Sequence, residues 1–277
     1  MVSSRSKSLP ALICGVNILL FAVTLIGASG VVTAMEVSAE SDYSSFLRIY
    51  GLVVLLEFLL LLFITPSLTA GAISSERERE TFDLMLTTQM KPSEIISGKL
   101  MSNLSFIIVL EISCIPAVLV ALIYGGVTVR EIAELLVIYT LEAFVFMSAG
   151  MFFSSVSKST ARASAFTYGF LVFLCFGTAV ISMLLAVISG GGNVFSLVIL
   201  LINPLINVAN IVAGQMGETA MLSEAASRVF AGYHSGLIGF WSIISTLSQL
   251  TMAVIMIIAS VINISPRRKI RKELDFE

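Results

Sequence analysis

Charge is the property that this sequence has least of for its length. Only 12% of the 277 residues are charged, whereas soluble domains carry about 25%. Hydrophobic residues make up 57% of the chain, and the mean hydropathy is +1.00. A soluble globular enzyme is therefore excluded, and so is a disordered chain, which needs low hydrophobicity and high charge. What remains is a polytopic membrane protein.

Histidine and cysteine are also scarce, with one histidine and three cysteines. Cys14, Cys114 and Cys175 lie in apolar runs without a paired spacing, so we interpret them as small hydrophobic residues rather than a disulfide framework. A metal site lacks ligands, since no acid lies beside His234. Gly27–Gly30 has the G-x-S-G form of rhomboid intramembrane proteases, but small residues at a helix end are the commoner explanation. The net charge of −2 gives no indication of a nucleic-acid partner.

Six apolar stretches are long enough to cross a bilayer, which takes about 20 residues. They predict an all-α polytopic fold with spans at about 12–35, 47–70, 100–124, 132–153, 163–189 and 237–264. Residues 1–277 then form a single transmembrane domain. The first stretch follows basic residues, as a signal peptide would. However, it exceeds the usual core of about 7–15 residues and lacks a clear cleavage site, which favours an uncleaved span.

A seventh apolar stretch, residues 194–214, is interrupted by asparagines and a proline. Pro204 removes a backbone donor and disfavours helix at Asn203, so a re-entrant helical hairpin fits better than a straight span. The distribution of basic residues distinguishes six membrane spans from seven. Six spans with both termini in the cytoplasm place thirteen Lys and Arg inside and three outside, whereas a seventh span would put the basic tail 266–272 outside. We therefore expect an outer re-entrant segment between the fifth and sixth spans.

The segment between the second and third expected spans, residues 72–99, carries an unusual pattern. Glu76–Glu80 alternates acidic and basic residues, apolar residues follow, and Pro92 begins a new helix that runs into the third span. On this pattern alone, the segment is either an amphipathic helix lying on lipid or a docking element for a cytoplasmic partner.

This segment resembles the signature of ABC-2 type transporter permeases. The matching residues, in the order of the family, are Glu76-Arg77-Glu78, Thr81, Phe82-Asp83-Leu84-Met85-Leu86, Ile95-Ile96 and Gly98-Lys99. The family often has Gly where this chain has Glu80, and Pro where it has Gln89. Together with six spans and an Asn-Pro pair before the last span, the resemblance covers nearly the whole chain.

The resemblance implies a permease subunit of an ABC exporter in a bacterial cytoplasmic membrane. Segment 72–99 would contain the coupling helix that docks on a separate ATPase. The residues expected at that contact are Glu76, Arg77, Glu78, Thr81, Phe82, Leu84 and Leu86. Two copies, or two related permeases, would assemble with two ATPase subunits within membrane lipid. The partner would bind ATP and magnesium, so no cofactor is expected in this chain, where we find no P-loop of the G-x-x-x-x-G-K-[ST] form.

Glu57, Glu111 and Glu142 each fall near the middle of an expected span, with no Lys or Arg in the span interiors. A charged side chain at the bilayer centre costs at least ~2.5 kcal/mol, so these groups should face the protein interior or water, or be protonated. They are either neutral groups bonded between helices or the lining of a pathway for cationic or amphipathic cargo.

Two other functional classes are compatible with the sequence. The intramembrane glutamates could serve an ion- or proton-coupled carrier, although carriers often have two similar halves and no clear internal repeat is found here. A membrane scaffold could also recruit a cytoplasmic partner through segment 72–99. The sequence does not identify a cargo.

Overall fold

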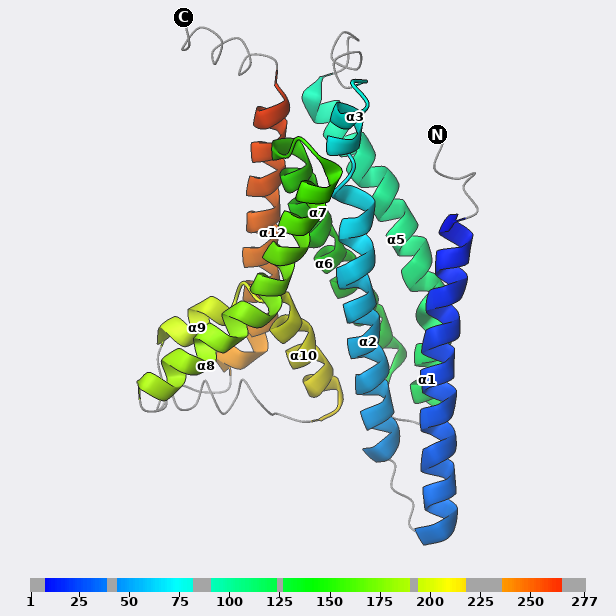
Figure 1. The fold of residues 1–277 in the computed structure, drawn as a ribbon. Helices are drawn as coiled ribbons and strands as arrows, with labels where there is room; N and C mark the ends of the chain where they lie inside the picture. Colours follow the sequence, from blue (N-terminus) through cyan, green and yellow to red (C-terminus); the bar gives the residue numbers. More distant parts are fainter. Residues whose placement is uncertain are drawn as a thin grey trace, which may run out of the picture.

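The structure, a computed structural model of the chain, describes residues 8–38, 44–81, 91–123, 127–189, 194–217 and 236–265. All regular elements in these ranges are helices, and six segments are long and apolar enough to cross a membrane. They are α1 (Ser8–Ser38), α2 (Ser44–Thr69), α5 (Pro92–Ile123), α6 (Val129–Val156), the composite of α7 (Thr160–Val172), η2 (Phe173–Gly177) and α8 (Thr178–Ile188), and α12 (Gly236–Ile264) (Figure 1). The predicted all-α fold with six spans is confirmed.

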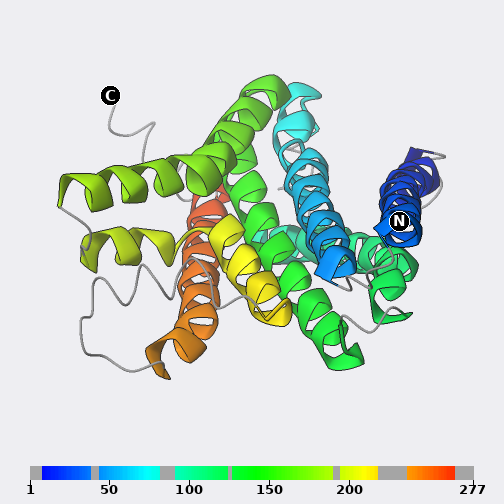
Figure 2. The same cartoon turned by 90° about the horizontal axis from the view of Figure 1, so that it is seen from below.

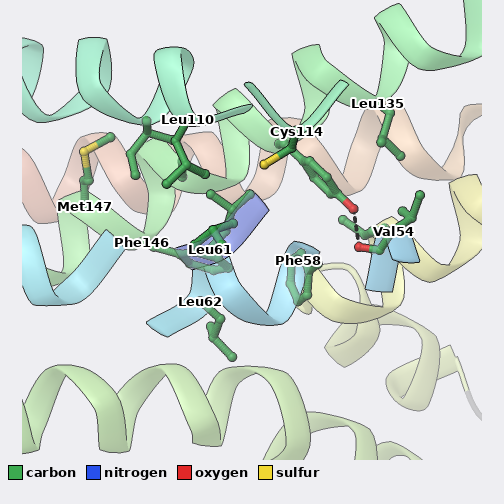
Figure 3. Close-up of a cluster of buried hydrophobic side chains, with 14 of the residues drawn as sticks. Val54, Phe58, Leu61, Leu62, Leu110, Cys114, Leu135, Phe146 and Met147 are labelled. Carbon is green, nitrogen blue, oxygen red and sulfur yellow. Dashed lines mark hydrogen bonds between the residues drawn. The ribbon is translucent and has the colours of Figure 1, made fainter. Parts of the chain in front are cut away.

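Helix α6 lies at the centre of the bundle and is the most buried of the six candidate spans. Helices α2, α5, α7 and α12 pack around it (Figure 2). Phe58 of α2 meets Phe146 of α6 edge to face, with ring centroids 5.8 Å apart. The hydroxyl of Tyr139 on α6 donates to the carbonyl oxygen of Val54 at 2.5 Å (Figure 3). Interlocked apolar side chains and buried polar bonds therefore join α6 to its neighbours, as expected where lipid gives no hydrophobic drive between helices.

The segment after the fifth span forms the predicted helical hairpin. Helix α9 (Val194–Leu200) packs beside α8, and α10 (Pro204–Gln215) meets α9 at an angle of 93° in the half of the bundle away from α3 (Figures 1 and 2). Pro204 is the first residue of α10. Asn203 has extended backbone, and its Oδ1 accepts the N–H of Ile206 at 3.0 Å. The break between α9 and α10 therefore lies directly before Pro204, because proline lacks the N–H that a helix interior needs and suits the first helical position.

Polar side chains of neighbouring helices satisfy the backbone at this break. The carbonyl oxygen of Leu201 accepts hydrogen bonds from the hydroxyls of Ser245 and Ser248 on α12, at 2.8 and 2.9 Å. The Asn203 amide donates to the carbonyl oxygen of Cys175 in η2 at 2.6 Å and to the Thr178 hydroxyl at 2.8 Å. Irregular backbone at membrane depth is tolerated where protein supplies such partners.

Candidate functional site

The described part of segment 72–99 includes an elbow, which we define as residues 71–81, at the end of the bundle where α5 begins and α12 ends (Figure 1). It contains the short helix α3 (Ser74–Glu78). The N–H of Thr81 donates to the carbonyl of Glu76 at 3.0 Å, and the N–H of Glu80 donates to the carbonyl of Arg77 at 3.1 Å. These two bonds form a Schellman motif, which ends the helix and reverses the chain.

One acidic side chain joins the elbow to the third span. Glu76 forms an ion pair with Lys99 of α5, with Oε1 2.5 Å from Nζ, and Lys99 also donates to the carbonyl oxygen of Ala72. Both charged side chains are about one-quarter exposed, at 25% each. Partial burial limits screening by water, so the pair holds the elbow against α5 more firmly than a fully exposed pair would.

A second acidic side chain joins the elbow to the fifth span. The two carboxyl oxygens of Glu78 accept from the backbone N–H and the hydroxyl of Thr160, at 3.0 and 2.9 Å. Thr160 is the first residue of α7, where unpaired N–H groups and the helix dipole favour an anion. Ser154, near the end of α6, accepts from the backbone N–H groups of Ile73 and Ser74 at 2.9 and 3.0 Å. The elbow is thus attached to α5, α6 and α7 as well as α2.

The predicted contact residues divide into three groups in the structure. Glu76, Arg77 and Glu78 contact their own chain, with Arg77 donating to the carbonyl of Ser157 at 3.3 Å. Thr81 is exposed. Phe82, Leu84 and Leu86 lie outside the described residues. Sequence reasoning missed Ser154 and Thr160, because single hydroxyl residues about 80 positions away carry no signal of contact with the elbow. Lys99 had a signal, as the last residue of the family signature.

The three intramembrane glutamates lie in the protein interior, each with a relative exposure of 2%. Glu111 of α5 accepts a hydrogen bond at Oε2 from the hydroxyl of Thr140 on α6, at 2.8 Å. Its Oε1 is buried without a hydrogen-bond partner among the described residues. Glu57 of α2 lies near Cys114 and Glu111 of α5. The structure therefore brings Glu57 and Glu111 together between α2 and α5.

Glu142 belongs to a different polar cluster, between α6, α10 and α12. The Asn207 amide donates to its Oε1 at 3.1 Å. With the Gln249 amide nitrogen turned toward the carboxyl group, it donates to both carboxyl oxygens at 2.7 and 2.9 Å. Glu142 thus receives hydrogen bonds from two other helices, one of which is part of the hairpin. This arrangement matches the structural interpretation of a carboxyl group bonded between helices.

Within the described ranges, no group of three or more His, Cys, Asp or Glu side chains is arranged to hold a metal ion. The described contacts of the elbow include hydrogen bonds and an ion pair. Side chains and backbone groups attach the elbow to α5, α6 and α7, and the chain itself joins it to α2, so a force on the elbow would act on all four spans.

A family model described as "ABC-2 family transporter protein" matches residues 5–264, which is nearly the whole chain. A comparison with curated proteins gave no match.

Proposed function

Because the chain belongs to the ABC-2 family of transporter proteins, we propose that it is the permease subunit of an ABC exporter driven by a separate ATPase chain. The observation that carries the proposal is the family match over residues 5–264. We place the protein in a bacterial cytoplasmic membrane with both termini in the cytoplasm, as the distribution of Lys and Arg favours. Two permeases, identical or related, would bind two ATPase subunits.

The elbow supports a route for coupling. Closure of the ATPase pair would push on the segment from Glu76 to Met90 and displace the elbow. The ion pair between Glu76 and Lys99 would pass that displacement to α5, and the bonds between Glu78 and Thr160 would pass it to α7. The fifth span would then move together with the second and third, and access to a cavity between the two permeases would change.

A pull-down tests the partnership. The tagged full-length chain, purified in mild detergent, should bring down a chain with a P-loop and ATPase activity, identified by mass spectrometry. Arg79 is exposed on the elbow. Replacing Arg79→Glu should weaken co-elution at least ten-fold, because like charges brought together at an interface cost several kcal/mol.

The matched control is Arg130→Glu, the same charge reversal at an exposed residue at the opposite end of α6. It should leave co-elution unchanged. If the folded wild-type chain brings down no ATPase, the permease proposal is wrong, and the ion-coupled carrier becomes the better explanation.

We extend the proposal to the glutamates, as a lining that favours cationic or amphipathic cargo. Glu111 is the strongest candidate, because its Oε1 is buried without a partner among the residues that the structure describes. Replacing Glu57, Glu111 and Glu142 one at a time by Gln keeps the side-chain shape and removes the charge. Transport of a lipophilic cation should fall for Glu111→Gln. Unchanged transport in all three variants would contradict the role in cargo selection.

A further inference from the structure

A groove of about 350 Å³ opens between α5 and α12, with Phe144 of α6 behind it. This volume lies in the usual range for small-molecule sites, about 300–1,000 Å³. Ser93, Glu94 and Ser97 line it in the first two turns of α5, and Leu104 and Ile257 line it farther from the ends of their helices. The groove therefore lies in the half of the bundle nearest the elbow, where α5 begins and α12 ends (Figure 1).

Polarity changes along the groove in one direction. Residues 93, 97 and 101 share one face of α5, since they are spaced by four positions. Along this face the side chains change from Ser93 and Ser97 to Met101, which is 63% exposed. On the facing helix, Ile257 and Val261 continue the apolar lining. The groove lining is thus mostly apolar, including Ile96 and Leu100, and its few polar residues are confined to the end of the bundle.

A bilayer supplies molecules with this polarity. An open apolar groove in the membrane takes up an acyl chain, since an empty groove would lose dispersion contacts along its lining. At the polar end, Glu94 is exposed and caps the start of α5, accepting the N–H of Lys91 at 3.0 Å. Glu94 lies in the first turn of a candidate span that begins at Pro92, so its carboxylate can meet a lipid headgroup. A carboxylate there favours a primary ammonium group, which donates hydrogen bonds, over the quaternary ammonium of choline, which has no N–H.

We propose that this groove binds a membrane phospholipid with a primary ammonium headgroup, whose acyl chain lies between α5 and α12 and whose ammonium group donates hydrogen bonds to Glu94. The proposal rests on the proposed function for one point only, the orientation of the protein in the membrane. With the elbow in the cytoplasm, the bound lipid belongs to the inner leaflet. Lipid bound here would contact α5, to which the elbow is attached, and α12, the last span.

Fluorescence quenching tests the site with the full chain in vesicles. The chain has one tryptophan, so Trp241→Phe removes the background, and Met101→Trp reports on the groove. Vesicles contain equal amounts of phosphatidylethanolamine and phosphatidylcholine, with bromine on the acyl chains of one lipid at a time. Brominated phosphatidylethanolamine should quench about two-fold more strongly than brominated phosphatidylcholine, as one exposed charge-assisted hydrogen bond would produce.

Three variants keep the result interpretable. Ile112→Trp, at a 56% exposed position of α5 outside the groove, should be quenched equally by both lipids. Val261→Trp reports from the other wall if Met101→Trp fails to fold. Glu94→Gln retains an acceptor for the Lys91 N–H and should abolish the preference.

Equal quenching by the two lipids at both groove positions, or a preference that survives Glu94→Gln, would overturn the proposal. Absence of quenching at the groove positions would do so as well, because it would mean that lipid does not enter. The vesicles contain no ATPase, so this result is independent of the pull-down. A missing ATPase partner would leave the lipid site standing, and a missing lipid preference would leave the permease proposal standing.

Discussion

Glu80 is the one residue other than glycine with a positive φ in the described part of the chain, at 59°. It is the first residue beyond the C-cap of α3, the position of the Schellman motif that glycine usually occupies. The ABC-2 signature often has glycine here. A side chain with a Cβ in this conformation costs about 1–2 kcal/mol, and the elbow accepts that cost at Glu80.

Replacing Glu80→Gly should therefore raise the free energy of unfolding by about 0.5–1 kcal/mol, because glycine adopts this conformation without a steric penalty. Unfolding in mixed micelles, followed by circular dichroism, measures the change. Glu80→Ala is the control, since it removes the carboxylate but keeps the Cβ. If Glu80→Ala stabilises as much as Glu80→Gly, charge rather than backbone conformation is responsible and the explanation fails.

Gly150 allows α6 to approach the end of α2. A Cβ added at Gly150 would overlap Thr69 Oγ1 and would lie 3.0 Å from Thr69 Cβ and 3.3 Å from the backbone nitrogen of Ala70. Gly150→Ala should lower the free energy of unfolding by about 1–3 kcal/mol, because a backbone atom in a packed interior cannot easily move aside. Gly98→Ala, with no heavy atom within 4 Å of the added Cβ, should be neutral or slightly stabilising. Equal effects of the two substitutions would contradict this explanation.

At the scale of the element, α10 is held in the interior of the bundle by two asparagines one turn apart. Asn203 bonds to η2 and α8, and Asn207 bonds to Glu142 of α6 and to Thr246 of α12. Both asparagines have a relative exposure of 0%. A short helix without a full span depends on such bonds, since lipid offers it no alternative partners.

Asn207→Ala should lower the free energy of unfolding by about 1–2 kcal/mol, near the upper end for polar bonds between membrane helices, because it removes a donor from a buried carboxyl group. Asn210→Ala is the matched control on the same helix. It removes a bond of 3.2 Å to the Ser242 hydroxyl, a neutral and less buried partner, and should cost less. A double-mutant cycle with Glu142→Gln measures the coupling directly. Zero coupling between positions 142 and 207 would show that the bond contributes nothing.

At the scale of the whole molecule, the distribution of basic residues predicts that the elbow faces the cytoplasm. Cysteine labelling in intact cells checks this orientation, in a Cys14→Ser background with Cys114 and Cys175 buried. Arg130→Cys should react with a membrane-impermeant thiol reagent added outside, because it lies at the opposite end of the bundle. Thr81→Cys should react only after the membrane is permeabilised. The reverse pattern would invert the topology and remove the elbow from any cytoplasmic ATPase.

The six spans were predictable because a stretch of about 20 apolar residues has few alternatives to a membrane helix. The break between α9 and α10 was predictable for a local reason as well, since proline disfavours helix in the residue before it and suits the first position of a new helix. The fifth span was predicted at 163–189 from its apolar composition, and the structure adds that it contains the π-helical turn Phe173–Gly177. The apolar side chains of this turn are compatible with an α-helix as well as a π-helix, so composition alone does not predict the turn.

The candidate site was predicted only in part. The charged segment was recognisable because its alternating pattern is local, and the burial of three glutamates followed from their position in apolar runs. Their partners were not predictable. Thr140, Asn207 and Gln249 meet the glutamates across helices, through contacts that depend on how each helix is rotated about its axis.

The sequence by itself determined that this chain is a six-span helical membrane protein with a charged segment between its second and third spans, because hydropathy, proline and charge act over short stretches. The tertiary structure alone decided that Glu78 bonds to Thr160, that Glu142 joins three helices and that a groove opens between α5 and α12. Those features arise from packing between distant segments, where one rotation of a helix exchanges every partner on its face.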